Sequence, residues 1–373
     1  MNGAGGRIGR AVTHEMVTFT KDPAQSHNSA YLIAINEPRG LDFVVNDYKS
    51  RDPVHGVYDW KVKKLSDKTL LLDGIPVSFF AEKDISKVPF TENGIDLVIE
   101  CSGFFGDPKV KDNTAELKPE DNGARAFLGY GVERVIQTYP AKTADIMMVM
   151  GVNHGRYNPA KHKVISNASC TTKALAMPLQ VLIDNGVNVH ALSMDTTHAE
   201  TGDDLSRLAG LLDKTNLEST PREEIEKIFR MTTHSTGAAR ATGYVISSLE
   251  GKMNGMSYRV PTLDGSFANL YLVASADNEL SAEGINNMFR EAVSNPAYMG
   301  RIGVFEGKDA GTFDIVGREE NAVVIPSKTN LIQLPFSPKG KKAYLVTVIS
   351  GYDNEIGSSK DPFLAARYVS DNL

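Results

Sequence analysis

The sequence has only two cysteines, Cys101 and Cys170, among its 373 residues. Disulfides are therefore excluded as its main source of stability, and a reducing compartment suits the thiols. No apolar run approaches the roughly 18 residues that a membrane-spanning helix needs. No charged segment followed by an apolar one opens the chain as an export signal would. We therefore expect a cytoplasmic protein.

A strong charge of either sign is also lacking, since the formal net charge is −6. Nothing in that balance favours a nucleic acid or a membrane surface as partner, and we expect neither. The hydrophobic share of 41% is ordinary for a globular protein. The length allows two domains of about 150 residues each. We found no internal repeat and no low-complexity segment.

The first half of the chain alternates short apolar runs with helical patterns, which indicates an α/β domain with a mostly parallel sheet. A polar loop is expected at 21–29, and a polar helix-and-loop region at 106–127. Strands are expected at 31–37, 69–72, 77–80, 96–100 and 134–137. A helix is expected at 11–17, directly after the opening glycine-rich turn.

The second half has longer extended runs, which predict an α+β domain with a larger mixed or antiparallel sheet. Strands are expected at 189–197, 256–261, 269–275, 331–334 and 343–349, and helices at 282–292 and 361–369. Thr220, Pro221 and Glu223 have the pattern of a helix start, so a further helix is expected at 221–229.

Cys170 lies where a strand ending at 165 meets a helical pattern that is clear from Ala174 onward. Backbone N–H groups and the helix dipole at such a position favour a thiolate, which is the nucleophilic form of cysteine. Ser169 and two threonines supply hydroxyl groups beside it. The alternative is a buried, inert cysteine in a strand-to-helix turn.

Three further positions are candidates for the same chemistry. His198 follows a predicted strand and can serve Cys170 as a general base, or be merely structural. The turn Ser-Thr-Gly-Ala-Ala at 235–239 opens a helix and offers an anion site, although an ordinary N-cap serine explains it equally. Arg259 stands alone in an apolar strand, where a phosphate or a carboxylate would pair with it.

The glycine-rich opening partly fits a dinucleotide-binding turn. That turn needs a strand before the glycines and an acidic residue at the end of the next strand. Glu37 meets the second condition and favours NAD over NADP, although Arg39 nearby suits a 2′-phosphate. The first condition fails, because no strand precedes Asn2. In one alignment, Gly6 and Gly9 are the second and third glycines of the motif, and Ala4 then stands where the first glycine belongs. In the other, Gly3 and Gly5 are the first two glycines, and one residue too many then precedes Gly9.

Together these motifs resemble the glyceraldehyde-3-phosphate dehydrogenase family, in order and with similar spacing over almost the whole chain. The resemblance implies a Rossmann-type dinucleotide-binding domain, residues 1–169 with 355–373, and a catalytic domain, residues 170–354. The matching segments are Gly-Arg-Ile-Gly-Arg at 6–10, Ala-Ile-Asn at 34–36, Met-Gly-Val-Asn at 150–153, Ser-Asn-Ala-Ser-Cys-Thr-Thr at 166–172, Thr-His-Ala at 197–199, Ser-Thr-Gly-Ala-Ala at 235–239, Arg-Val-Pro-Thr at 259–262 and Tyr-Asp-Asn-Glu at 352–355.

The resemblance also implies a mechanism. Cys170 would attack the aldehyde of glyceraldehyde 3-phosphate with His198 as base, hydride would pass to NAD, and inorganic phosphate would release 1,3-bisphosphoglycerate from a thioester. The phosphate group of the substrate would be bound by Thr201, Asp203 and Arg259. The attacking inorganic phosphate would be bound by Ser169, Thr171, Thr236 and Gly237. The cofactor residues would be Gly6, Arg7, Ile8, Gly9, Glu37, Ser102, Thr138 and Asn354; no metal is expected.

Several positions depart from the family pattern. The strand before Asn2 is missing, which indicates a truncated chain, a misplaced start or a remodelled domain. Glu37 replaces an aspartate. Lys173 replaces an asparagine and either lowers the pKa of Cys170 or points to solvent. Gly351 and Ser358 replace aromatic residues, and residues 204–231 barely match the loop that packs on a neighbouring subunit.

The departures leave three hypotheses. The first is the phosphorylating NAD-dependent dehydrogenase, with NADP not excluded, acting as a homo-oligomer that the family pattern predicts to be a tetramer. The second is a non-catalytic structural or regulatory homologue. The third is erythrose-4-phosphate dehydrogenase, against which the intact Ser-Thr-Gly-Ala-Ala turn argues. Arg222 and Arg230 are the candidates for the remaining arginine at the attacking phosphate.

Overall fold

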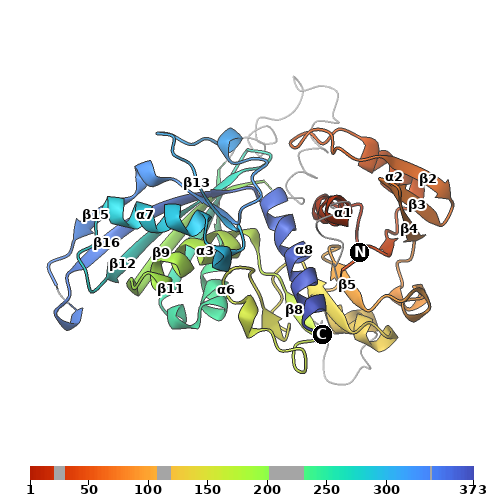
Figure 1. The fold of residues 1–373 in the computed structure, drawn as a ribbon, viewed down its shortest axis with the longest axis horizontal. Coiled ribbons are helices and arrows are strands. Elements are labelled where there is room, and N and C mark those ends of the chain that lie inside the picture. The colour runs from red at the N-terminus through yellow and green to blue at the C-terminus, as the bar shows by residue number, and fades with distance from the viewer. Residues whose placement is uncertain (21–29, 107–118, 201–230, 337) are drawn as a thin grey trace. The chain divides into compact units, whose positions relative to one another are not determined.

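The computed structural model describes residues 1–20, 30–106, 119–200, 231–336 and 338–373 (Figure 1). Its contacts divide the chain into two compact units, Met1–Ser169 with Glu355–Leu373, and Cys170–Asn354. Several predictions fall outside the described residues. They are the loop expected at 21–29, most of the polar region at 106–127, the helix expected at 221–229, and the candidate residues Thr201, Asp203, Arg222 and Arg230.

The first unit is built on parallel pairing between short buried strands. Strand β1 (Ala34–Asn36) pairs with β4 (Ile75–Phe80), and β5 (Leu97–Glu100), β6 (Arg134–Gln137), β8 (Val164–Ser166) and β7 (Ile146–Met147) follow one another in parallel. Strands β2 (Val62–Ser66) and β3 (Thr69–Leu72) extend the β4 edge in antiparallel fashion. Most of these parallel strands are apolar and buried, as strands covered on both faces must be.

Met1 and Asn2 lie between β1 and β5, at the N-terminus where the sequence predicted no strand. Asn2 forms parallel bridges to both Asn36 and Glu100. The N–H of Asn2 donates to the carbonyl of Ile99 at 3.0 Å, and the N–H of Asn36 donates to the carbonyl of Met1 at 2.9 Å. No strand precedes Asn2, as the sequence indicated, and Met1 and Asn2 alone join β1 to β5 through these bridges and hydrogen bonds.

Helices of the first unit present one apolar face each. Helix α1 (Arg7–Thr20) buries Gly9, Val12, Met16 and their neighbours, a spacing of three to four residues. It packs against α8 (Ile356–Asp371), where the rings of Phe19 and Phe363 meet edge to face at 5.0 Å. The other helices are α2 (Leu41–Lys49) and the 3₁₀ segments Ile85–Lys87, Thr91–Asn93, Pro119–Tyr130 and His154–Arg156.

The second unit is built on an eight-stranded mixed sheet in the order β10-β11-β9-β12-β16-β14-β13, with β15 also paired to β16 (Figure 1). Its pairs are antiparallel except β11 with β9 and β13 with β14. The strands are β9 (Asn188–Ala199), β10 (Thr232–Ser235), β11 (Met253–Val260), β12 (Ser266–Ser275), β13 (Ile302–Val304), β14 (Ala322–Val324), β15 (Asn330–Gln333) and β16 (Ala343–Tyr352).

Helix α3 (Cys170–Asp184) packs against β16 and β14 and against two further helices, α6 (Ala238–Val245) and α7 (Ala282–Val293). The face of α3 from Thr171 to Leu182 is almost entirely buried, which fixes its first turn against the sheet. Short 3₁₀ segments are Ser247–Leu249, Pro296–Tyr298, Thr312–Asp314, Pro326–Lys328 and Pro338–Gly340. A parallel Rossmann-like sheet plus a mixed-sheet unit confirms the predicted fold class. No helix of the described residues is long and apolar enough to cross a membrane.

Candidate active site

Cys170 is the first residue of α3, as the sequence predicted. The turn that delivers it contains Ala168, whose φ of 57° lies in the left-handed region that residues with a Cβ seldom adopt. Free backbone N–H groups at a helix start are ready to bind developing negative charge. The turn therefore places the sulfur beside an anion-stabilising helix end.

His198 lies next to this thiol. Its Nε2 is 3.4 Å from the Sγ of Cys170, and its side chain is almost fully buried. Its Nδ1 is 2.7 Å from the carbonyl oxygen of Ala199, which can only accept a hydrogen bond. In the tautomer with the proton on Nδ1, donated to that carbonyl, Nε2 is an acceptor that faces the sulfur, and the proposed chemistry uses this tautomer. In the other tautomer Nδ1 accepts from the guanidinium of Arg259, which can only donate. The geometry is that of a thiol with its general base.

The charge state of the pair differs from the expected thiolate and imidazolium. Burial, followed by the nearby charge of Arg259, lowers the pKa of His198 to about 4. Burial also raises the pKa of the Cys170 thiol, which outweighs the opposing charges of Lys173 and Arg259. Desolvation of the thiol thus opposes the expected lowering of its pKa and outweighs the hydrogen bonds from Thr171 and the two charges. At neutral pH the pair consists of a thiol and a neutral imidazole.

Arg259 reaches this pair from the neighbouring strand. Residues Arg259 of β11 and His198 of β9 are register partners, and the guanidinium contacts Nδ1 of His198. It also donates to the carbonyl oxygen of Ala199 at 2.8 Å. The sequence predicted a phosphate or carboxylate partner, and among the described residues Arg259 instead makes these contacts beside the base.

Replacing Arg259 with glutamine is expected to raise the pKa of His198 above about 4, while burial keeps it below the ordinary value of about 6.5. The amide removes the positive charge and leaves the packing of the imidazole largely intact. NMR titration of the imidazole C–H signals measures the change, with the His198→Asn variant identifying the signal. A pKa that stays at the wild-type value would show that burial alone sets it.

Tyr352 supports the turn of Cys170 from β16 and was not recognised in the sequence. Its hydroxyl lies 2.9 Å from the Oγ1 atoms of both Thr171 and Thr196. The tyrosine is fully buried, and burial raises its pKa above the ordinary range. Thr171 is thus held through its hydroxyl to Tyr352. The only sequence signal was an aromatic residue directly before Asp-Asn-Glu.

The other residues predicted to bind phosphate lie at the starts of two different helices, α6 and α3. Thr236 and Gly237 precede α6, where Oγ1 of Thr236 accepts from the N–H of Ala238 at 3.1 Å. Ser169 immediately precedes α3. Thr236 and Gly237 therefore lie at a helix terminus, and the anion site there stays a prediction, while Thr201 and Asp203 lie outside the described residues.

Two departures in the second unit have a structural explanation. Lys173 is 1% exposed, so the possibility that it points to solvent was wrong. Gly351 lies in β16 where a Cβ would be 2.5 Å from Cδ1 of Ile315. The side chain of Ile315 therefore fills the space beside Gly351. The unusual glycine is thus compensated by packing.

In the glycine-rich turn of the first unit, a Cβ would meet backbone atoms at Gly3 and Gly9 and the ends of neighbouring side chains at Gly5. A Cβ would meet the backbone of Ser102 at Gly3, the Glu37 carboxylate at Gly5 and the carbonyl oxygen of Gly3 at Gly9. At Gly6 a Cβ would meet only one atom, at an ordinary 3.5 Å. The sequence left two alignments open, and these contacts favour the one with Gly3, Gly5 and Gly9, in which Gly6 is the extra residue. The turn still ends at the start of α1, where a pyrophosphate fits.

Glu37 follows β1 and faces this turn. Its Oε2 accepts from the N–H of Gly5 at 3.0 Å, and its Oε1 accepts from Nε of Arg39 at 2.8 Å. Burial raises the pKa of Glu37, but the hydrogen bonds from Arg39 and Gly5 outweigh it and hold the carboxyl below its usual range. A carboxylate in this position suits two ribose hydroxyls, so the described residues fit a dinucleotide.

The remaining predicted cofactor residues are placed as follows. Ser102 follows β5 and donates through its N–H to Oε1 of Glu100 at 2.7 Å. Thr138 follows β6, and its N–H donates to the carbonyl oxygen of Glu100 at 3.1 Å. Arg7 opens α1, with Ile8 next to it. In the second unit, Asn354 accepts through Oδ1 from the hydroxyl of Ser266 at 2.8 Å.

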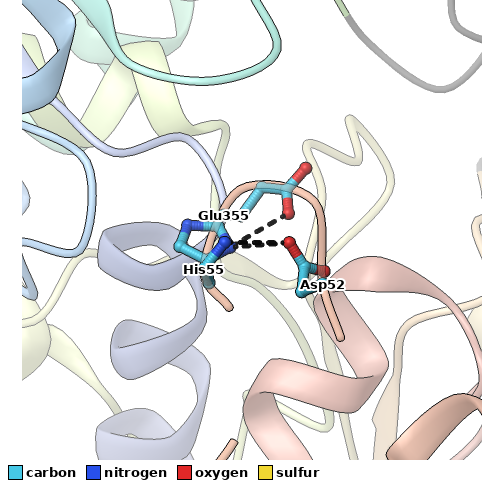
Figure 2. Close-up of side chains that lie close together, drawn as sticks. All are labelled: Asp52, His55 and Glu355. Carbon is cyan, nitrogen blue, oxygen red and sulfur yellow. Dashed lines mark hydrogen bonds and ion pairs between the residues drawn. The ribbon is translucent and has the colours of Figure 1, made fainter. Parts of the chain in front are cut away.

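A cluster of titratable groups that the sequence analysis missed lies in the first unit. Figure 2 shows His55 with the carboxylates of Asp52 and Glu355, and Nδ1 of His55 is 3.6 Å and 3.8 Å from them. Arg7 pairs with Glu355, and Arg10 lies 3.9 Å from Asp52. Arg10 also lies 3.7 Å from Asp47, and we interpret the cluster as an ion-pair network that ties the start of α8 to the segment after α2.

Replacing Asp52 with asparagine is expected to lower the free energy of unfolding near neutral pH by about 1–3 kcal/mol. Burial raises the pKa of Asp52, but hydrogen bonds from His55 and Val54 outweigh it and hold the pKa below its usual range. The stabilisation is therefore present above the unfolded value of about 3.9 and is lost as the pH falls below it. Urea unfolding at several pH values should show the variant and wild type converging in acid. Asp42→Asn is the control, since that residue forms only an exposed pair with Lys64.

Comparisons with known proteins agree with this geometry. The NAD-binding domain model of glyceraldehyde 3-phosphate dehydrogenase matches residues 1–108, and the C-terminal domain model matches residues 169–354. Glyceraldehyde-3-phosphate dehydrogenase of Priestia megaterium is 32% identical over 365 residues, which cover 98% of this chain and 96% of that protein. The Geobacillus stearothermophilus enzyme is 33% identical over 366 residues, with the same coverage. The chain therefore belongs to the glyceraldehyde-3-phosphate dehydrogenase family.

Proposed function

We propose that the chain catalyses the NAD-dependent, phosphorylating oxidation of glyceraldehyde 3-phosphate to 1,3-bisphosphoglycerate. The observation that carries this proposal is the 3.4 Å contact between Sγ of Cys170 and Nε2 of His198 at the start of α3. Family membership supplies the substrate and the NAD-binding domain. A thiol next to a neutral base is what covalent catalysis on an aldehyde requires.

The first step forms a carbon–sulfur bond. Nε2 of His198 takes the proton from Sγ of Cys170 as the sulfur attacks the aldehyde carbon, and the carbonyl electrons move to oxygen. The N–H groups at the start of α3 stabilise that oxyanion. NAD, held by the glycine-rich turn and Glu37 of the first unit, would supply the hydride acceptor for this oxidation. Loss of the hydride re-forms the carbonyl from the oxyanion and leaves Cys170 carrying an acyl group as a thioester, with the thiol proton on His198.

The second step releases the product. A phosphate oxygen attacks the thioester carbon, and the carbon–sulfur bond breaks with Cys170 leaving as thiolate. His198, protonated in the first step, returns its proton to the sulfur or to solvent, which restores the thiol and the neutral base. The low pKa of His198 favours this return, because the imidazolium is unstable in its buried environment.

The residue roles follow the family pattern. We assign the substrate phosphate to Arg259 with Thr201 and Asp203, and the attacking phosphate to Ser169, Thr171, Thr236 and Gly237. The first unit is the dinucleotide-binding domain and the second unit the catalytic domain. Glu37 binds the ribose, the turn from Gly5 to Gly9 with Arg7 and Ile8 binds the pyrophosphate, Ser102 and Thr138 line the cofactor, and Asn354 binds the nicotinamide carboxamide.

One assay separates this proposal from the two alternatives. The purified chain is given NAD, inorganic phosphate and either glyceraldehyde 3-phosphate or erythrose 4-phosphate, and NADH formation is followed by absorbance. We expect a higher kcat/KM for the three-carbon aldehyde and dependence on phosphate. A higher value for the four-carbon aldehyde would contradict the assigned substrate. NAD binding in calorimetry without turnover of either aldehyde would favour a non-catalytic homologue.

We further propose a homo-oligomer, a tetramer by family, that works in the cytoplasm. The family pattern supports the assembly, and the need for a reduced catalytic thiol supports the compartment. Light scattering coupled to size exclusion measures the mass in solution. A monomeric mass for the active enzyme would contradict the assembly.

A further inference from the structure

The hydroxyl of Tyr352 joins three elements of the second unit beside the reactive sulfur. Tyr352 is the last residue of β16, Thr171 is the second residue of α3, and Thr196 lies in β9. The phenolic oxygen is 2.9 Å from Oγ1 of each threonine. Tyr352 and Thr196 are each 1% exposed, so these hydrogen bonds form away from bulk water. The three hydroxyls therefore form a buried chain that ends at the first turn of α3.

Thr171 is placed to hold a phosphate beside the sulfur of Cys170. Its Oγ1 lies 4.0 Å from Sγ of Cys170. The acyl carbon is bonded to that sulfur, and an attacking phosphate oxygen must come to about 3–3.5 Å from the carbon. The threonine side chain is β-branched and has two common χ1 rotamers in helices. The hydrogen bond to Tyr352 selects one of them and keeps the Thr171 hydroxyl within reach of the attacking phosphate.

The Tyr352 hydroxyl has one hydrogen to donate at neutral pH. Burial, followed by the nearby charge of Cys170, raises the pKa of Tyr352 above the ordinary range, so the phenol stays protonated. A phenol donates one hydrogen bond and also accepts, as a threonine hydroxyl does. Ser266 meets the same hydroxyl, but the hydrogen of Ser266 is donated to Oδ1 of Asn354 at 2.8 Å. Ser266 can therefore only accept from Tyr352.

A bound phosphate sets the direction of the hydrogen bonds in this chain. Phosphate oxygens are anionic acceptors, so the hydrogen of Thr171 is best donated to the phosphate in a charge-assisted bond. Oγ1 of Thr171 must then accept, and Tyr352 supplies its single hydrogen to it. The oxygen of Tyr352 in turn accepts from Thr196. Each hydroxyl polarises the next, which strengthens the final bond to the phosphate.

We propose that Tyr352 is a positioning residue for the phosphate that attacks the thioester, because its hydroxyl donates to Thr171 and directs the Thr171 hydrogen to that phosphate. The proposal rests on the proposed function, in which Thr171 binds this phosphate, and adds a residue that does not itself touch it. The role belongs to the second step, since no phosphate takes part in forming the carbon–sulfur bond. Loss of the phenolic hydroxyl therefore weakens the use of phosphate more than the oxidation of the aldehyde.

Steady-state kinetics of the full-length Tyr352→Phe variant test this proposal. NADH formation from glyceraldehyde 3-phosphate and NAD is measured while the phosphate concentration is varied. Phenylalanine keeps the ring and loses only the hydroxyl. We expect the KM for phosphate to rise about fivefold, the usual effect of one lost hydrogen bond, while kcat and the KM for the aldehyde stay within about twofold. Tyr344→Phe removes a hydroxyl from the other end of β16 and, as the matched control, should change none of these constants by more than about twofold.

A double-mutant cycle separates positioning from general support of the fold. If Tyr352 acts through Thr171, Tyr352→Phe should change the KM for phosphate by less than about twofold when Thr171→Val is already present. A fivefold effect in both backgrounds would overturn the proposal, because Tyr352 would then act without Thr171. An unchanged KM for phosphate in the Tyr352→Phe single variant would overturn it as well.

Two further outcomes have a defined meaning. If Tyr352→Phe does not fold, Thr171→Val decides, because an unchanged KM for phosphate in that variant leaves Tyr352 no phosphate ligand to position and overturns the proposal, whereas a rise of about fivefold or more supports it. Absence of phosphate-dependent turnover in the wild type would contradict the proposed function itself. Phosphate-dependent turnover of the wild type with an unchanged KM in the Tyr352 variant would contradict only the role of Tyr352.

Discussion

The Cys170→Ser variant is expected to lose at least about 10⁴-fold in kcat/KM for aldehyde oxidation. A serine hydroxyl is far harder to deprotonate than a thiol, and the neutral His198 has a pKa of only about 4. Such a weak base cannot generate an alkoxide, and an oxygen ester would not transfer its acyl group as a thioester does. NADH formation in the presence of phosphate measures the loss.

The matched control for this prediction is Cys101→Ser. Cys101 is the only other cysteine and directly follows β5 in the first unit. It has no part in the proposed chemistry, so kcat/KM should stay within about twofold of wild type, as for most substitutions away from a site. Calorimetry should give the same NAD affinity for both variants. More than a few per cent of wild-type activity in the Cys170 variant would show that another group carries the reaction.

Replacing Glu37 with glutamine is expected to shift coenzyme preference from NAD toward NADP by about 100-fold in the ratio of kcat/KM values. The carboxylate accepts from the ribose hydroxyls in our assignment and would repel a 2′-phosphate. It also pairs with Arg39 through both oxygens, at 2.8 Å and 3.1 Å. The amide removes the repulsion and releases the guanidinium for a phosphate. Initial rates with each coenzyme give the ratio.

A second substitution tests the reason for that shift. Adding Arg39→Ala to the Glu37→Gln variant should remove most of the gain with NADP, because the released guanidinium is then absent. The loss with NAD should remain. If the single variant keeps the wild-type ratio, Glu37 does not contact the ribose and its role is limited to the turn at Gly5.

Most strands could be predicted because buried strands contain runs of apolar residues that are visible in the sequence. The predicted strands at 69–72 and 134–137 coincide with β3, which buries Leu70 and Leu72, and with β6, which buries Val135 and Ile136 at its centre. Strand β11 begins earlier than predicted, at Met253, and contains Gly255. A Cβ at that glycine would lie 2.2 Å from Sδ of Met194 on the neighbouring strand. Sequence alone does not reveal such close pairing, since glycine usually marks a turn.

The sequence was enough to predict which residues form the candidate site, but not the protonation states of Cys170 and His198. Cys170 and His198 were identified by their positions at a helix start and a strand end. Their 3.4 Å contact joins residues 28 positions apart and depends on how α3 packs on the sheet. The depth of burial, which raises the thiol pKa, depends on the same packing. Tyr352 was missed for this reason, since its hydroxyl meets Thr171 and Thr196 only in the folded chain.

The central claim is that Cys170 carries the oxidised substrate as a thioester. The most direct test mixes the enzyme with glyceraldehyde 3-phosphate and NAD without inorganic phosphate, stops the reaction in acid, and measures peptide masses. The account predicts one phosphoglyceroyl group on the peptide that contains Cys170, and its disappearance when phosphate is added before the acid. NADH formation with an unmodified Cys170 peptide, or with the acyl group on another residue, would contradict it.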